Sequence, residues 1–326
     1  MRVFLTAGVA IVTAASVAAV AAATAASTSL CVGSQDGCYQ TIQAAVDVAP
    51  NGAAITIGAG NFSGGITIDK SLELKGGGAS STVISGGGPV VTIGLAGAAT
   101  QPSVRLTGLT ITGGLNTSGP RGLGGGIAVL AGASLTLSSS VVSGNRVAPA
   151  SNAPSGNPCG SLCPYALASG AGIDNAGTTT LKGVAVTNNL AGGPITSDAE
   201  GGGIMNERDA TLVVRDSLVA GNTARAVLPY GRFAEAGGIF SRKGSSLTVV
   251  GSSVSGNTAE LSTAFSSAVT GAQTGGIKLA GDDTTTGTIR DSHIDGNSVV
   301  ATSTGGELFA FAGGINSPPV LVATTE

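Results

Sequence analysis

A short phrase that recurs along this chain limits what the chain can fold into. Two small residues followed by isoleucine, usually Gly-Gly-Ile, recur at Ile127, Ile173, Ile204, Ile239, Ile277 and Ile315. An asparagine follows five of these isoleucines after 16 to 20 residues, at Asn145, Asn189, Asn222, Asn257 and Asn297. The spacing from each asparagine to the next isoleucine varies more, from 15 to 28 residues. The chain is therefore an array of similar modules separated by inserts of variable length.

Apolar residues keep a fixed distance from the asparagine of each module. Eight residues before it stand Leu137, Leu181, Val214, Val249 and Ile289. Three residues before it stand Val142, Val186, Val219, Val254 and Ile294, and an earlier coil ending at Gly114 fits the frame with Leu106 and Ile111. Short β-branched stretches bounded by Gly, Asn and Ser predict strands. One module is too small to bury its own apolar face, so we expect the modules to stack as a solenoid.

These repeats predict an all-β chain folded as a parallel β-helix, with equivalent residues of successive coils stacked about 4.8 Å apart. The valines and isoleucines should form interior columns, and the asparagines a column at a turn, where their amides bond between coils. We expect the glycine pairs at turns with positive φ. The amphipathic stretch from Gln40 to Ala49, ended by Pro50, predicts a short helix that covers the first coil.

The stretch "CYQTIQAAVDVAPNGAAITIGAGNFSGG", which starts at Cys38, closely resembles the N-terminal cap and first coils of pectin-lyase-like right-handed β-helix proteins. The GGGI…GN coils resemble those of exported bacterial surface proteins of the polymorphic outer-membrane-protein type. The resemblance covers nearly all of residues 37–326. It implies a cap helix in 37–50, first coils in 54–114 and repeat coils in 115–326. This superfamily includes lyases, hydrolases, esterases and adhesins, so the resemblance implies a fold and leaves the activity open.

Residues 1–26 have the pattern of a secretory signal peptide, with Arg2, an apolar run and small residues at 23–25. The alternative is an uncleaved membrane anchor. After cleavage we expect no membrane span in residues 27–326, and a secreted or cell-surface location. The frame predicts another asparagine beyond Glu326, so we expect the array to be truncated at its C-terminus.

Export would allow disulfides between the four cysteines. The simplest pairing is local, Cys31 with Cys38 and Cys159 with Cys163, and a zinc site is the alternative.

The charges give no reason to expect a nucleic-acid partner. The chain has 15 Lys and Arg against 18 Asp and Glu, and the basic residues are scattered rather than gathered in a stripe. No glycine-rich loop precedes a predicted helix, so we do not expect nucleotide binding. No metal ligands and no cofactor are predicted.

One candidate for catalysis is a column four residues before the module isoleucine, made of Glu200, Glu235 and Gln273. If the register holds, the two carboxylates lie one strand spacing apart, close to the separation in retaining glycosidases. Stacked like charges would also raise one pKa, as an acid catalyst requires. Asp198 is nearby. The alternative is that these are ordinary exposed glutamates beside turns.

A second candidate is "DSHID", in which Asp291, His293 and Asp295 are expected to alternate along a strand and share its outer face. Neighbouring coils offer no matching ligands, so we expect a solvated face.

The inserts are the third candidate. "TARAVLPYGRFAEA" and "SVVATSTGGELFAFA" each alternate around a Gly-containing turn, which predicts hairpins on one side of the solenoid. Aromatic rings beside arginine suit sugar rings and acidic glycans, and the candidate binding residues are Tyr230, Arg232, Phe233, Phe309 and Phe311. The alternative is that these rings only pack insert against insert.

We therefore expect a non-catalytic, adhesin-like scaffold that presents its inserts to a polysaccharide or to a surface protein. The alternative function is a polysaccharide-degrading enzyme, a lyase or a glycoside hydrolase, that acts on an acidic polysaccharide.

Overall fold

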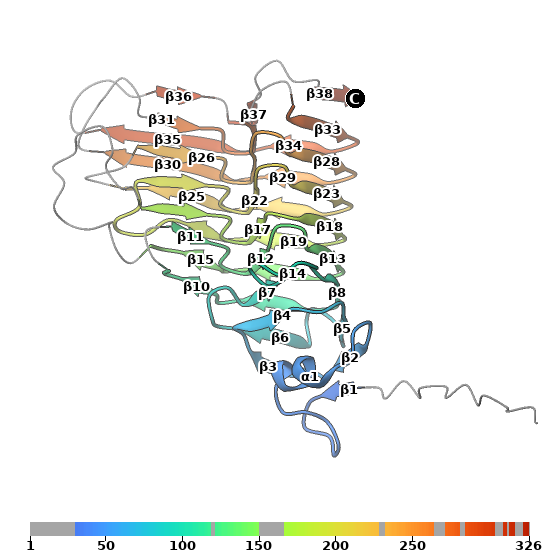
Figure 1. The fold of residues 1–326 in the computed structure, drawn as a ribbon. Coiled ribbons are helices and arrows are strands. Elements are labelled where there is room, and N and C mark those ends of the chain that lie inside the picture. The colour runs from blue at the N-terminus through green and yellow to red at the C-terminus, as the bar shows by residue number, and fades with distance from the viewer. Residues whose placement is uncertain are drawn as a thin grey trace, which may run out of the picture.

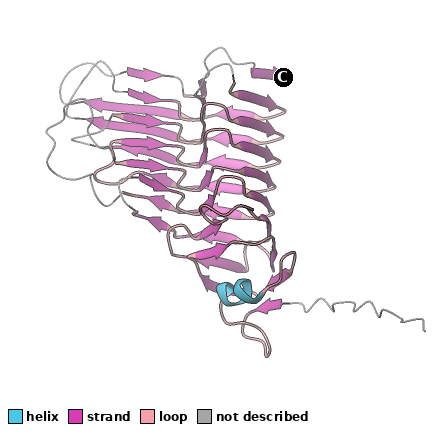
Figure 2. Ribbon diagram, viewed as in Figure 1, coloured by secondary structure: helices cyan, strands magenta, loops and turns pink. Residues whose placement is uncertain are grey.

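A computed structural model of the chain describes residues 30–118, 121–149, 166–227, 232–263, 271–280, 284–303, 309–311, 313–316 and 322–325. Within these ranges the strands form five parallel sheets, and the one helix is α1 (Ile42–Val48). The chain winds as a right-handed parallel β-helix, as the repeats and the resemblance predicted (Figures 1 and 2). The predicted signal peptide, Cys159 and Cys163 lie outside the described residues.

Three sheets enclose the main core, and we call them A, B and C. Sheet A contains β1 (Leu30–Val32), β2 (Ala54–Ile57), β5 (Glu73–Gly76), β8 (Ser103–Thr107), β13 (Ser134–Ser138), β18 (Thr178–Lys182), β23 (Thr211–Arg215), β28 (Ser246–Val250), β33 (Thr286–Arg290) and β38 (Val322–Thr325). Sheet B contains β3 (Gly60–Ser63), β6 (Thr82–Ser85), β9 (Thr110–Thr112), β14 (Val141–Ser143), β19 (Ala185–Thr187), β24 (Leu218–Ala220), β29 (Ser253–Ser255) and β34 (His293–Asp295). Sheet C contains β4 (Ile66–Ile68), β7 (Val91–Ile93), β12 (Ile127–Val129), β17 (Ile173–Asn175), β22 (Ile204–Asn206), β27 (Ile239–Ser241), β32 (Ile277–Leu279) and β37 (Ile315–Asn316).

Two further sheets, D and E, form a lateral extension on one side of the later coils (Figure 1). Sheet D contains β10 (Leu115–Asn116), β15 (Arg146–Val147), β20 (Leu190–Ala191), β25 (Thr223–Ala226), β30 (Thr258–Thr263) and β35 (Ser298–Ser303). Sheet E contains β11 (Arg121–Leu123), β16 (Leu167–Ser169), β21 (Asp198–Glu200), β26 (Phe233–Glu235), β31 (Gly271–Gln273) and β36 (Phe309–Phe311). Small side chains fill the space between the two sheets, chiefly alanines such as Ala199, Ala224 and Ala234.

The expected hairpins in the inserts are therefore wrong. β25 pairs with β30 and β26 pairs with β31, each in parallel register with the equivalent strand of the next coil. Within the described residues, β25 and β26 belong to different sheets and do not pair with each other. Stacking between coils gives each strand two neighbours, whereas an isolated hairpin would leave both strands with an open edge.

The predicted interior columns are confirmed. Leu137, Leu181, Val214, Val249 and Ile289 pair in sequence in sheet A, and Val142, Val186, Val219, Val254 and Ile294 do so in sheet B. The module isoleucines stack in sheet C, and their column continues back through Val91 to Ile66. Each of these strands points one face inward, and the resulting core is continuous from the cap to Ile289.

The predicted asparagine column is a continuous hydrogen-bonded ladder. Asn222 Oδ1 accepts from both the backbone N–H and the Nδ2 of Asn189, at 3.0 and 2.9 Å. Asn222 Nδ2 donates to Asn257 Oδ1 and to the carbonyl of Val186, both at 2.9 Å. Every polar atom of this buried side chain is thus bonded to a neighbouring coil.

The glycine pairs have a different role from the one expected. Positive φ falls on the residue before the pair, which is Gly201 at 56°, and Ala236 and Thr274 occupy that position in later coils at 53° and 61°. The second residue of the pair has no room for a side chain, whereas the first is Ala171 in one coil. A Cβ on Gly203 would lie 2.8 Å from the carbonyl oxygen of Gly238 and 2.9 Å from Asn222 Nδ2. Glycine is required there because successive coils approach closely.

The N-terminal end is covered as expected. Ile42, Ala45 and Val46 of α1 are buried against the first coil, and Thr41 caps the helix by accepting from the Ala44 N–H at 3.2 Å. The predicted Cys31–Cys38 disulfide is present. In the described part of the chain, no helix has the length and hydrophobicity needed to cross a bilayer.

We predict that Asn222→Ala lowers the free energy of unfolding by about 2–4 kcal/mol, because buried groups of Asn189 and Val186 lose their partners. Urea unfolding followed by circular dichroism checks this, with the exposed Asn61→Ala as the control. Equal urea midpoints for the two variants would contradict the conclusion that the asparagine ladder stabilises the fold.

We predict that Gly203→Ala destabilises the fold by about 2–4 kcal/mol, because the methyl group would press on the next coil. The matched control is Gly183→Asn. Gly183 has φ 61° and open space at its Cβ position, and Asp216 and Asp291 hold the same place in other coils. We expect the control to change stability by less than about 1 kcal/mol. A larger loss in the control than in Gly203→Ala would show that conformation, rather than close approach, selects the glycines.

Candidate functional site

The candidate site is a groove on the outside of the solenoid, where the outer face of sheet E meets that of sheet C. The left-handed residue before each glycine pair lies between a strand of sheet E and the next strand of sheet C, as Gly201 lies between β21 and β22. The groove has a volume of about 450 Å³. Its polar lining consists of the carboxyl groups of Asp198 and Glu200 and the cationic groups of Arg121, Arg208, Arg232, Arg242 and Lys243.

Alternation along β21 places both carboxyl groups in the groove. Ala199 points inward and is fully buried between sheets D and E, so Asp198 and Glu200 on either side of it point outward. Both are nevertheless shielded from solvent, and Asp198 is 6% exposed. Two carboxyl groups from one strand therefore share one partly dry surface.

Sheet C contributes the residue that follows each module isoleucine. These residues pair in sequence as Ala128, Asp174, Met205, Phe240 and Lys278. Phe240 lines the groove and is only 4% exposed. Asp174 is near enough to Glu200, Glu207 and Arg242 for their charges to act on it, and its Oδ1 is buried without a hydrogen-bond partner. This column could not be recognised in the sequence because its residue type changes from coil to coil.

Arg242, in the loop after β27 of sheet C, forms an ion pair with a residue of sheet E. Its Nη2 donates to Glu200 Oε2, and its Nε lies 3.5 Å from Glu207 Oε2. The guanidinium also sits over the Phe240 ring, 6.0 Å from the ring centre. Arg242 is not part of the repeat pattern, so nothing in the sequence distinguishes it from the other arginines.

The expected register of Glu200 and Glu235 is confirmed, since the two residues pair directly and Gln273 follows in the next coil. Their surroundings differ, however. Glu235 forms an ion pair with Lys278, which also donates to Gln273 Oε1 at 2.8 Å. Glu200 and Asp198 line the groove, and Glu235 is outside its lining. The pair of carboxyl groups that share the groove is therefore Asp198 with Glu200.

Burial raises the pKa of all three acidic groups at the centre of the site. It raises the pKa of Asp198, against the opposing effects of Arg232 and of the Ser197 hydrogen bond. It raises the pKa of Glu200, where Arg242 opposes the shift and Glu235 adds to it. It holds the pKa of Asp174 well above its usual range, with Glu207 adding to the effect and Arg242 opposing it.

The expected binding residues are only partly gathered here. Arg232 and Phe233 both line the groove, and the Arg232 guanidinium lies 5.6 Å from the Phe233 ring centre. Tyr230 lies outside the described residues, and Phe309 and Phe311 belong to β36 at the end of sheet E, where the backbone alone is described.

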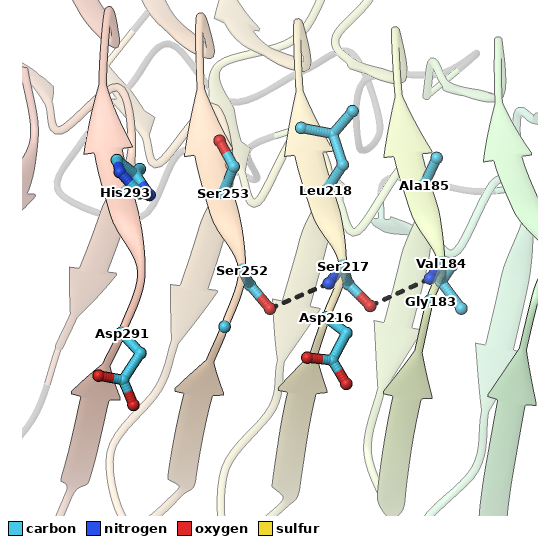
Figure 3. Close-up of a pocket in the computed structure, with 11 residues that line it drawn as sticks. Gly183, Val184, Ala185, Asp216, Ser217, Leu218, Ser252, Ser253, Asp291 and His293 are labelled. Carbon is cyan, nitrogen blue, oxygen red and sulfur yellow. Dashed lines mark hydrogen bonds between the residues drawn. The ribbon is translucent and has the colours of Figure 1, made fainter.

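A second depression, of about 620 Å³, lies at the turn between sheets A and B (Figure 3). Its serines are used structurally: the hydroxyls of Ser252 and Ser217 each accept a backbone N–H from the preceding coil at 3.1 Å. The carboxylates of Asp216 and Asp291 are separated by the coil of Gly251, and hence by about 9.6 Å. These groups do not converge on one ligand.

The "DSHID" expectation needs one correction. His293 and Asp295 are exposed on the outer face of β34, as expected, but Asp291 precedes the strand in a turn with φ 51°. Across the part of the chain that the structure describes, no group of three or more His, Cys, Asp or Glu residues could hold a metal ion.

No family model and no curated protein matches this chain. Among solved structures, it is similar to a pectin methylesterase from carrot, at 13% identity and a TM-score of 0.43 over 93% of this chain and 89% of that one. It is also similar to the pectin methylesterase PemA from Erwinia chrysanthemi, at 12% identity and a TM-score of 0.44 over 91% and 93% of the two chains. An alginate lyase from Paenibacillus sp. gives 13% identity and a TM-score of 0.26 over 84% and 96%. Identities this low do not identify functional residues, so those of this chain are inferred from its own geometry.

We predict that Asp174→Asn stabilises the protein at pH 7–8 by about 1 kcal/mol or more, because a buried carboxylate is costly to ionise. The folded-state pKa of Asp174 is raised above its unfolded value. The native state therefore binds more protons than the unfolded state between the two pKa values, and stability falls as pH rises through that window. The gain should vanish below about pH 4, where Asp174 is protonated in both states. Thermal unfolding from pH 3.5 to 8 checks this against exposed Asp216→Asn, and a gain that does not vary with pH would contradict it.

Proposed function

We propose that the groove binds a linear acidic polysaccharide and hydrolyses its glycosidic bonds, with Asp198 as the proton donor and Glu200 as the base. The observation that carries this proposal is the placement of two shielded carboxyl groups on one face of β21, inside a groove lined with cations. This is the enzymatic alternative rather than the non-catalytic scaffold that we first expected.

The shape of the groove suits a polymer. Its residues come from successive coils, from Arg121 in β11 to Phe233 in β26, so it runs along the solenoid axis for about 14 Å.

The side chains suit acidic sugars. Guanidinium groups bind carboxylates through two parallel hydrogen bonds, and Arg121, Arg208 and Arg232 are positioned along the groove. Phe233, which is partly exposed in the groove, offers an apolar ring for a sugar.

The two carboxyl groups support acid–base catalysis. A raised pKa lets Asp198 hold a proton closer to neutral pH, and it makes Glu200 a stronger base than an ordinary glutamate. In the proposed step the glycosidic C–O bond breaks and its oxygen takes the Asp198 proton. A water oxygen bonds to the anomeric carbon, and the water proton passes to Glu200.

Strand geometry places the Cα atoms of Asp198 and Glu200 about 6.7 Å apart. Carboxyl groups at a similar separation would leave room for a sugar oxygen and a water molecule. Glu235 takes no part in the proposed step because Lys278 holds it outside the groove lining. If residues 1–26 direct export as expected, the substrate is an extracellular polysaccharide.

We predict that Asp198→Asn and Glu200→Gln each lower hydrolysis by about 10²–10⁴-fold, whereas Glu235→Gln stays within about threefold of the unsubstituted protein. The assay measures released reducing ends from polygalacturonate, alginate and a neutral polysaccharide, and circular dichroism confirms that each variant is folded. Binding of a polysaccharide without release of reducing ends would contradict hydrolysis and favour the non-catalytic scaffold. Products that absorb in the ultraviolet would identify a lyase instead.

A further inference from the structure

The ion pair between Arg242 and Glu200 conflicts with the role proposed for Glu200. A base must accept a proton from water, but Glu200 Oε2 already accepts a hydrogen bond from the Arg242 guanidinium. Both side chains are shielded, with 22% of Arg242 and 15% of Glu200 exposed. Because Arg242 lowers the pKa of Glu200, Glu200 becomes a stronger base when Arg242 has another partner.

Arg242 is shared by more than one carboxyl group. Glu200 and Glu207 both contact it, and the buried Asp174, whose Oδ1 has no hydrogen-bond partner, lies near enough for Arg242 to lower its pKa. Glu207 contacts the Nε side of the guanidinium while Glu200 contacts Nη2, so a ligand could replace Glu200 without detaching Arg242 from Glu207. Arg242 also lines the groove and can be reached by a ligand there.

We propose that a carboxylate of the bound polysaccharide displaces Glu200 from Arg242, so that an acidic sugar both binds to the groove and frees the catalytic base. This inference rests on the proposed function and adds a device that determines specificity. A neutral sugar has no group that competes for Arg242, so it leaves Glu200 in the ion pair. The ligand class is a hexuronate unit within a polymer.

Competition for Arg242 has a consequence for binding that does not depend on turnover. Removing the Glu200 charge removes the competitor, so the uronate should bind more tightly to the variant. Glu235 provides a matched control, because it is a glutamate one strand away that pairs with Lys278 instead. A general loss of negative charge near the groove would act on both variants alike.

The experiment measures the affinity of hexagalacturonate and of its fully methyl-esterified form by calorimetry at pH 7. All proteins carry Asp198→Asn to prevent cleavage. We expect Glu200→Gln to tighten binding of the charged hexamer about 5- to 10-fold and to leave the esterified hexamer unchanged, whereas Glu235→Gln changes neither. Arg242→Gln should weaken binding of the charged hexamer, and in its presence Glu200→Gln should no longer tighten binding.

Unchanged or weaker binding in Glu200→Gln would overturn the proposal, and so would equal tightening in Glu235→Gln. Failure of the charged hexamer to bind at all would also overturn it. A third outcome is that Glu200→Gln tightens binding while the unsubstituted protein releases no reducing ends from any polymer. This outcome would support competition for Arg242 and would contradict the proposed hydrolysis. The two proposals can therefore fail separately.

Discussion

Close contact between the glycine pairs of successive coils is the constraint on which the rest of the structure depends. The carbonyl of Gly238 occupies the space that a side chain on Gly203 would need, so the backbones meet directly at this turn. That contact brings Asn222 within hydrogen-bonding distance of the asparagines in the coils before and after it. Together they hold the register of the repeat coils from Asn145 to Asn297, because a slip of one residue would break the ladder and turn the apolar columns outward.

The same turn creates the groove. A left-handed residue at positions such as Gly201 redirects the chain before the pair, and the outer faces of sheets E and C then meet at an angle. Side chains from two sheets can converge there, which they cannot do on the flat faces of sheets A and B. At the turn between those two sheets, Asp216 and Asp291 stay about 9.6 Å apart because both belong to one column. Converging sheets also shield the groove from solvent, and this shielding raises the pKa of its acidic groups.

The interior of this fold could be predicted from the sequence, and much of its outer surface could not. Interior columns repeat the same class of residue in every coil. The spacing of the module isoleucines in the sequence therefore predicted which residues pair between coils. Sheets D and E could not be predicted, because strands as short as β15 and β20 have two residues each and lie within inserts whose length varies. The groove could not be predicted for a related reason. Stacking selects the inward residues, but the outward position held by Asp174 and Phe240 is free to differ in each coil.

The separation between repeated inward positions and variable outward positions in this chain has a consequence for how such a repeat protein can evolve. Loss of one whole coil, residues 190–222, would bring Asn189 against Asn257 and rejoin the asparagine ladder without a fault. The same deletion would remove Asp198 and Glu200, the two residues proposed for acid–base catalysis, and would leave the stacking of the other coils intact. Recombination between repeats can therefore lengthen or shorten the solenoid while its chemistry is gained or lost in a single coil.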